Sequence, residues 1–192
     1  MSETFAQITI SLDGFGAGAN DSPDHPLGEG GLELHRWLFE STKSPVDTQF
    51  AAEMLQDTGA VVIGRRMADL GIPLWGANGA FGKPVFIVTR RPHPVVVKGP
   101  TTFTYVTDGL EAALAQARAA AGAQNICVAG GPTVIRQALA EGALDSLRLS
   151  IAPFLLGRGV PLFRDLPTPL RFTPVQVLAS PLATHINYKV ER

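Results

Sequence analysis

Cysteine is almost absent from this 192-residue sequence, which contains only Cys127. A single cysteine excludes an intramolecular disulfide framework and a zinc site of the CxxC type. No apolar stretch approaches the roughly 20 residues that a membrane-spanning helix needs. The N-terminus also lacks a basic region followed by an apolar core, which is the pattern of a secretory signal. The sequence therefore predicts a cytoplasmic protein with one buried, structural thiol.

An excess of charge of one sign is missing as well. Lysine and arginine together number 16 and aspartate and glutamate 17, so the formal net charge is −1. This balance provides no basic field for nucleic acid or for an anionic membrane surface. The four histidines are too far apart to form a ligand set, so we expect no metal. No serine or cysteine lies in a nucleophile-elbow pattern.

What is present is a regular alternation of short apolar runs and helical patterns. The chain length suits one domain over residues 1–192. Continuous apolar runs are typical of strands that are covered on both faces of a sheet. Strands are predicted at 5–12, 60–64, 84–89, 103–106 and 125–129. Helical patterns are found at 32–39, 45–58, 109–121 and 132–142.

Capping residues define the expected helix ends. Ser44 is placed to cap the helix over 45–58, and Gly59 is placed to end it. Asp108 is expected to cap the helix that follows, with Glu111 in capping-box position.

The last third of the chain lacks helical patterns. Its strands are predicted at 147–152, 170–178 and 184–190. Helices early and a strand meander late predict an α/β fold with a mixed sheet, parallel at first and antiparallel at one edge.

The strongest functional signal is the sequence ICVAGGPTV at 126–134. A buried strand ends, Gly130 and Gly131 make the turn, Pro132 begins a helix, and Thr133 offers a hydroxyl. Free N–H groups and the helix dipole at such a terminus favour an anion, and glycine lets a phosphate approach the backbone closely. The alternative is a tight turn that uses glycine only for its geometry.

Arginine follows two other predicted strands, in VVIGRRM at 61–67 and in TRR at 89–91. In an open α/β sheet, groups at the carboxyl ends of parallel strands converge on one crevice. The planar guanidinium group matches phosphate, and its specific use would be the ribose 2′-phosphate that distinguishes NADPH from NADH. Solvated surface charge is the alternative for each arginine.

The segment 14–31 is rich in glycine and unusually long for a connection. Gly14, Gly16 and Gly18 invite comparison with a Rossmann fingerprint, but that motif has different spacing and opens directly into a helix. We interpret the segment as a mobile loop, such as a lid over cofactor and substrate.

Two carboxylates are candidates for proton transfer. Asp13 ends the first strand beside the glycine-rich segment, and Asp47 lies in the first turn of the helix over 45–58. The alternative for Asp13 is a turn residue. The alternative for Asp47 is a charge that complements the helix dipole.

With these motifs, the chain resembles the dihydrofolate reductase-like superfamily over nearly its whole length. The closer similarity is to the reductase domain of bacterial riboflavin biosynthesis and its stand-alone relatives. The segments that carry the resemblance are 11–14, 62–67, 84–90, 129–134 and 144–163.

The resemblance implies a three-layer α/β/α fold around a mixed central sheet of about eight strands, with NADPH lying across the strand ends. Asp13 and the loop after it would border the nicotinamide and the substrate, and relatives often form homodimers. The adenosine side of the cofactor would contact Gly64, Arg65, Arg66, Met67, Thr89 and Arg90. The pyrophosphate would contact Gly130, Gly131, Pro132, Thr133 and Val134.

The sequence departs from the riboflavin-pathway pattern at two positions. Phe15 stands where a basic residue is common, and Ala129 where an acidic residue is common. Asp47 is near the place of the helix carboxylate of dihydrofolate reductases. We therefore expect an NADPH-dependent reductase that acts on a C=N or C=O bond of a small heterocyclic or sugar-derived substrate. The alternatives are 5-amino-6-(5-phosphoribosylamino)uracil reductase and a nucleotide- or flavin-binding protein without turnover.

Overall fold

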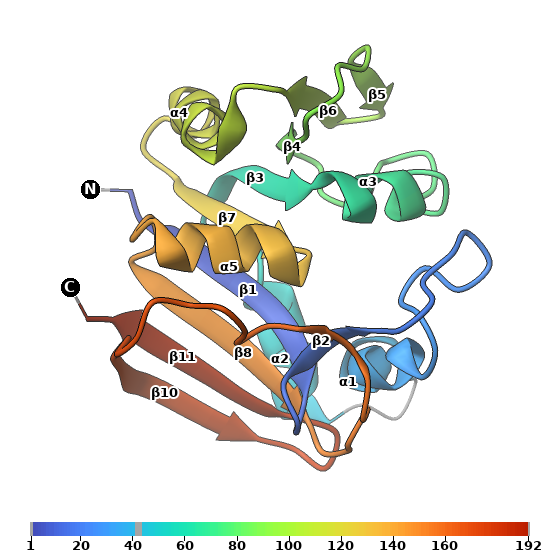
Figure 1. Ribbon diagram of the computed structural model, residues 1–192, viewed down its shortest axis with the longest axis vertical. Coiled ribbons are helices and arrows are strands. Elements are labelled where there is room, and N and C mark those ends of the chain that lie inside the picture. Colours follow the sequence, from blue (N-terminus) through green and yellow to red (C-terminus); the bar gives the residue numbers. More distant parts are fainter. Residues whose placement is uncertain (1, 41–43, 192) are drawn as a thin grey trace.

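The computed structural model describes residues 2–40 and 44–191, and within them the chain forms one large mixed sheet (Figure 1). The sheet has nine strands in the order β10-β11-β8-β1-β7-β3-β4-β6-β5. Their bounds are β1 Thr4–Ser11, β3 Thr58–Gly64, β4 Pro84–Val88, β5 Val96–Lys98, β6 Thr101–Val106, β7 Asn125–Gly130, β8 Ser146–Ala152, β10 Phe172–Ala179 and β11 Thr184–Val190.

The centre of the sheet is parallel and both of its edges are antiparallel. The neighbouring strands from β8 through β1, β7, β3 and β4 to β6 all run in one direction. The C-terminal strands β11 and β10 close one edge in antiparallel fashion, as the sequence predicts. The short strand β5 adds a second antiparallel edge that the sequence pattern did not indicate, because only three of its residues pair with β6.

Helices cover both faces of the sheet, which confirms the three-layer architecture. On β3, Val62 packs with the cluster that includes α4 (Gly109–Ala121) and α5 (Pro132–Ala140). The alternate residues Val61 and Ile63 pack on the opposite face with α3 (Arg65–Gly71). Figure 1 shows α5 in front of the sheet and α2 (Pro45–Glu53) behind it. The continuous apolar runs in the sequence reflect this burial on two sides.

The glycine-rich segment 14–31 contains a short strand, β2 (Phe15–Gly18), that pairs with β9 (Gly159–Pro161) in a separate two-stranded sheet. A loop over 19–30 follows and leads into the 3-10 helix η1 (Gly31–His35) and helix α1 (Arg36–Phe39). The loop folds back on β2, where a Cβ at Gly28 would lie 2.4 Å from the Gly18 carbonyl oxygen. This close approach, together with a φ of 74° at Gly28, requires glycine there.

One predicted helix end and one predicted capping box were wrong. Helix α2 ends at Glu53 rather than near position 58, and Gly59 lies inside β3 instead of ending the helix. A Cβ at Gly59 would lie 2.7 Å from the Ala121 Cα, so close packing against α4 explains this glycine. Asp108 is the N-cap residue of α4, but its side chain makes no capping hydrogen bond. The capping box instead occurs at α2, between Ser44 and Asp47.

The single thiol lies at the centre of the sheet. Cys127 is on β7, between β1 and β3, and only 1% of its surface is exposed. Burial raises the pKa of this thiol to about 12, so it stays protonated at neutral pH.

Candidate cofactor-binding site

Three of the sequence motifs meet at one rim of the sheet. Strands β7, β3 and β4 are parallel neighbours, so their carboxyl ends lie side by side. In the register of these strands, Ile63 pairs with Gly130 and Gly64 pairs with Val88. The turn after each strand therefore opens toward the same edge, as expected from the sequence.

The double-glycine turn and the GRRM motif are in direct contact. A Cβ at Gly64 would lie 3.8 Å from the Gly131 backbone nitrogen and 3.8 Å from the Val134 Cβ. A Cβ at Gly130 would lie 3.4 Å from the Met67 sulfur. The peptide bond between Gly130 and Gly131 is cis. The two motifs therefore form one continuous surface.

The space in front of Gly131 is open. A Cβ at this residue would meet no heavy atom within 4 Å. Gly131 is also the N-cap of α5, with Pro132 in the first turn, and it provides no side-chain capping bond. The positive end of the nine-residue helix thus lies beside uncrowded backbone. This arrangement suits a phosphate group.

Arg65 extends toward the end of β4. Its Nε donates to Asp69 Oδ1 over 2.6 Å, and its Nη1 donates to the Arg91 carbonyl oxygen over 3.5 Å. The guanidinium carbon lies 5.4 Å from the centre of the Tyr105 ring. These contacts hold Arg65 beside the TRR turn and direct it away from the double-glycine turn.

The Thr89 side chain stabilises the turn after β4 by hydrogen bonds to the Arg91 backbone. Its hydroxyl accepts from the Arg91 amide over 3.1 Å and donates to the Arg91 carbonyl over 3.2 Å. Thr89 is buried and Arg90 is exposed. Thr89 therefore shapes the turn, and Arg90 presents its charge to solvent.

Arg66 extends to the glycine-rich loop instead. Its Nε donates to Asp21 Oδ2 over 2.8 Å, and its Nη2 donates to Asp21 Oδ1 over 3.0 Å. Asp21 is a site residue that the sequence analysis missed. The loop itself had been identified, but nothing in the order of residues indicates that its tip meets α3, 45 positions away.

Asp13 is held as an ionised carboxylate. It accepts hydrogen bonds from the Ser11 hydroxyl over 2.5 Å, the Leu156 amide over 3.0 Å and the Gly157 amide over 2.7 Å. The Ser11 bond and the two amides lower the pKa of Asp13 to about 2. A group that ionises so readily holds no proton at neutral pH to donate to a substrate. The structure gives Asp13 the role of anchoring residues 156–157.

A cavity of about 520 Å³ opens beside Asp13. Its remaining walls are almost entirely apolar, and it lies on the face of the sheet that packs against α5. The volume suits a small ring system, but the single carboxylate does not favour a phosphate there. The lining residues are Ile10, Leu12, Asp13, Gly14, Leu147, Leu149, Ile151, Phe163, Phe172 and Tyr188.

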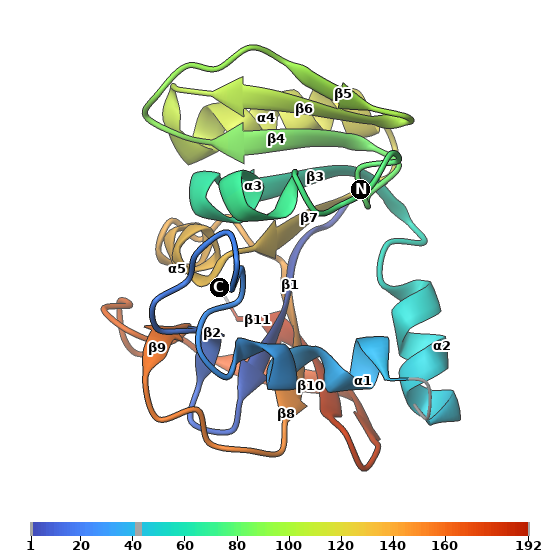
Figure 2. The same cartoon turned by 90° about the vertical axis from the view of Figure 1, so that its right-hand side faces the viewer.

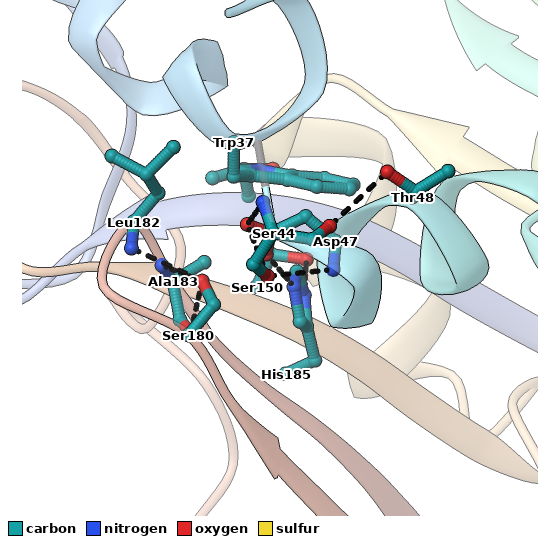
Figure 3. Close-up of polar contacts among 10 residues, drawn as sticks. Trp37, Ser44, Asp47, Thr48, Ser150, Ser180, Leu182, Ala183 and His185 are labelled. Carbon is teal, nitrogen blue, oxygen red and sulfur yellow. Dashed lines mark hydrogen bonds and ion pairs between the residues drawn. The ribbon is translucent and has the colours of Figure 1, made fainter. Parts of the chain in front are cut away.

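Asp47 lies in a buried network on the other face of the sheet, shown in Figure 3. Its Oδ1 is 2.9 Å from His185 Nε2, and its Oδ2 accepts from the Ser44 hydroxyl over 3.0 Å. Burial opposes ionisation of Asp47, but hydrogen bonds from His185, Ser180 and Ser44 outweigh it and lower the pKa. Asp47 has no exposed surface, so it cannot reach a bound substrate in this conformation and is not a proton donor.

The network has the same partners as a hydrolase triad. Ser150 Oγ lies 2.8 Å from His185 Nδ1, and the imidazole contacts Asp47 on its other side. The Phe50 ring stacks on the imidazole with 4.1 Å between the ring centres. The Trp37 ring packs edge-on against it with 4.7 Å between the ring centres. At most 2% of Ser150, His185 or Asp47 is exposed, so no substrate has access to the serine. The network is structural.

The described part of the chain contains neither a candidate metal site nor a candidate membrane-spanning helix. Within residues 2–40 and 44–191, no three His, Cys, Asp or Glu side chains are grouped so that they could hold a metal ion. In the same residues, no helix has the length and apolar character required to cross a bilayer.

The nine-stranded mixed sheet, parallel at its centre and covered by helices on both faces, is a fold of the dihydrofolate reductase-like class. Residues 4–185 match the family model of the RibD C-terminal domain, so the chain belongs to that family. Both findings confirm the resemblance inferred from the motifs.

Individual proteins agree with this assignment. The uncharacterized protein YwjB of Bacillus subtilis is 26% identical over 169 residues, which cover 85% of this chain and 84% of YwjB. A protein from Shewanella sp. PV-4, named for riboflavin biosynthesis, has a TM-score of 0.77 at 22% identity and 99% coverage of both chains. Dihydrofolate reductase from Enterococcus faecalis, solved with NADP(H), has a TM-score of 0.65 at 14% identity, covering 99% of this chain and 97% of the reductase. The family and the shared fold support a reductase role.

Proposed function

We propose that this protein is an NADPH-dependent reductase that transfers a hydride to a polarised C=N or C=O bond of a small heterocyclic or sugar-derived substrate. The observation that carries the proposal is the open backbone at Gly131, which lies beside Gly64 on the same rim as Arg65 and Arg66. Glycine turns and guanidinium groups on one rim offer several phosphate sites at once, as an extended dinucleotide requires. The binding of NADP(H) by the Enterococcus reductase, which has the same fold, supports this choice of cofactor.

The proposed contacts divide the rim into two parts. Gly130, Gly131, Pro132, Thr133 and Val134 contact the pyrophosphate, which accepts from the free N–H groups of the turn and lies at the positive end of α5. The adenosine side, including the ribose 2′-phosphate, contacts the second part of the rim. That part consists of Gly64, Arg65, Arg66, Met67, Thr89 and Arg90.

NADPH would supply the hydride, and the protein would supply orientation and a pocket shielded from water. Asp13 lies at the end of β1 with its carboxylate already ionised. In this proposal Asp13 anchors residues 156–157 through the Leu156 and Gly157 amides, and solvent delivers the proton that completes the reduction. The glycine-rich loop over 19–30 reaches the rim where Asp21 accepts from Arg66.

A thermal-shift comparison tests the choice of cofactor. NADPH is expected to raise the melting temperature more than NADH, FMN or FAD at equal concentrations, because only a ligand that binds the folded state stabilises it. Consumption of NADPH is then followed with a panel of cyclic imines, lactones and aldose-derived carbonyl compounds. Tight binding of NADPH without oxidation across the panel would favour a nucleotide-binding protein. A larger shift with a flavin would contradict the proposal.

Reduction of the riboflavin-pathway pyrimidine is the second candidate. The family match and the naming of the Shewanella protein favour it. 5-Amino-6-(5-phosphoribosylamino)uracil is therefore included in the substrate panel. If it is reduced far faster than the unphosphorylated compounds, this candidate replaces the broader one.

A further inference from the structure

The contact between Asp21 and Arg66 has the geometry of a phosphate contact. Two nitrogens of the guanidinium group donate to the two carboxylate oxygens, over 2.8 and 3.0 Å. Nη2 donates in addition to the Asp21 carbonyl oxygen over 2.5 Å. Such a fork of two parallel bonds is how arginine recognises carboxylates and phosphates alike. Nε and Nη2 of Arg66 are thus already engaged by the chain itself.

The loop that carries Asp21 extends to the rim of the sheet and contacts α3 there. Next to Asp21, Asn20 donates to Glu29 over 2.8 Å, and Arg158 forms an ion pair with the same carboxylate. Within β2, which precedes the loop, Gly16 is packed so closely that a Cβ there would lie 2.6 Å from Pro132, the first residue of α5. Figure 2 shows the loop rising from β2 toward α3. The segment from Gly16 to Asp21 therefore runs from the start of α5 to Arg66.

We infer that Asp21 is a latch that occupies the place of a cofactor phosphate on Arg66, so that binding of the dinucleotide and release of the loop tip are coupled. This inference rests on the proposed function, because it concerns the same rim. A phosphate group carries more negative charge than a carboxylate and offers more acceptor oxygens, so it displaces Asp21 when the dinucleotide binds. The loop tip is then free to move over the bound cofactor.

The exposure of the pair fits a latch that opens readily. The side chain of Arg66 is 61% exposed and that of Asp21 is 28% exposed. Exposed ion pairs contribute little to stability, because water screens them and both side chains must be ordered. A ligand can therefore replace the pair at small cost. By thermodynamic linkage, removing the latch strengthens cofactor binding by no more than the amount by which the pair stabilises the latched loop.

The test compares Asp21→Asn with Asp24→Asn in the full-length protein. Asp24 is exposed on the same loop tip, so its substitution makes the same charge change without touching the latch. NADPH affinity is measured by isothermal titration calorimetry. Asp21→Asn is expected to tighten NADPH binding about threefold to fivefold, the upper range for an exposed ion pair. Asp24→Asn is expected to leave the affinity unchanged.

A double variant tests whether Arg66 is the partner of Asp21. In Arg66→Ala protein, NADPH binding is weaker overall, and adding Asp21→Asn is expected to give no further gain, because the coupling requires both side chains. Equal affinity of Asp21→Asn and wild-type protein overturns the inference. So does an equal gain in Asp24→Asn, which would indicate only a general effect of charge.

Amide hydrogen exchange without any nucleotide separates this inference from the proposed function. Asp21→Asn is expected to speed exchange in residues 19–28, and Asp24→Asn is not. If the wild-type protein binds no NADPH but the exchange result holds, the proposed function fails and the latch is a contact of the free protein only. If NADPH binds but exchange in the loop is unchanged by Asp21→Asn, the latch is wrong and the proposed function stands.

Discussion

His185 on the last strand lies 2.9 Å from Asp47 on helix α2, although 138 positions separate them in the sequence. Because an ionised carboxylate only accepts hydrogen bonds, the His185 Nε2 carries the proton. Burial lowers the pKa of His185 and favours the neutral imidazole, whose Nδ1 then accepts from Ser150. The imidazole therefore fastens α2 to β11 and β8 (Figure 3). This pairing holds one of the outer layers of the fold to the sheet.

Loss of the Asp47 carboxylate is expected to cost substantial stability. Asp47→Ala removes the α2 capping box and leaves the buried His185 N–H without an acceptor, which together cost about 2–4 kcal/mol in the free energy of unfolding. Urea denaturation measures the loss, with the exposed Asp57→Ala as the matched control. If both variants lose equally little, the network is not the fastening described above.

Stability is expected to fall on mild acidification. Burial lowers the pKa of His35 to about 4, and burial also lowers the pKa of His185 against the opposing effect of Asp47. An ordinary histidine titrates near about 6.5, so between about pH 6.5 and 4 the unfolded chain binds more protons than the folded one. The free energy of unfolding therefore decreases as the pH falls through this window.

Histidine variants identify the source of that slope. His35→Gln and His185→Gln are each expected to flatten the decrease between about pH 6.5 and 5, where ordinary carboxylates remain ionised. The exposed His93→Gln serves as the control. Urea midpoints recorded at several pH values provide the measurement, and an unchanged slope in both buried-site variants would contradict the assignment.

Two glycine substitutions are expected to have opposite effects. Gly131→Ala projects a methyl group into open space at a φ of −70°, so it changes stability little but obstructs the cofactor phosphate. Gly59→Ala forces a Cβ to within 2.7 Å of the Ala121 Cα, at a cost of about 1–3 kcal/mol, and leaves the rim intact. Thermal melts and NADPH titrations of both variants check the pattern. Normal NADPH affinity in Gly131→Ala would remove the double-glycine turn from the proposed site.

Replacing the rim arginines should reduce the discrimination between NADPH and NADH. Changing Arg65, Arg66 or Arg90 to Ala removes an ion pair with the 2′-phosphate at a solvent-accessible position, which is worth up to about 1 kcal/mol, or roughly fivefold in affinity. The ratio of the two dissociation constants is measured for each variant and for the control Arg171→Ala. An undiminished ratio in all three would refute their role at the 2′-phosphate.

The sequence predicted those parts of the fold that depend on local patterns. Val61, Val62 and Ile63 are consecutive apolar residues, and the structure buries them on alternate faces of a parallel strand. The Gly130–Gly131 turn and the start of α5 also follow from neighbouring residues. The end of α2 did not, because Gly59 serves a contact with Ala121, which is far away in the sequence.

The candidate site was likewise predicted where it depends on local motifs and missed where it depends on the tertiary fold. The glycine and arginine motifs were found because each follows its own strand. The partners of Asp47 and Arg66 were not found, since His185 and Asp21 come near them only through the tertiary fold. The cofactor contacts and the homodimer inferred from the resemblance stay predictions.

The buried position of Cys127 makes its thiol an internal probe of unfolding. A thiol with a pKa near 12, enclosed between β1 and β3, reacts with an alkylating reagent only when those strands separate. Movements of the 19–30 loop leave it untouched. The rate of alkylation of Cys127 thus reports how often the central sheet opens. A cysteine introduced at an exposed site would react without such an opening and would report separately on local motion.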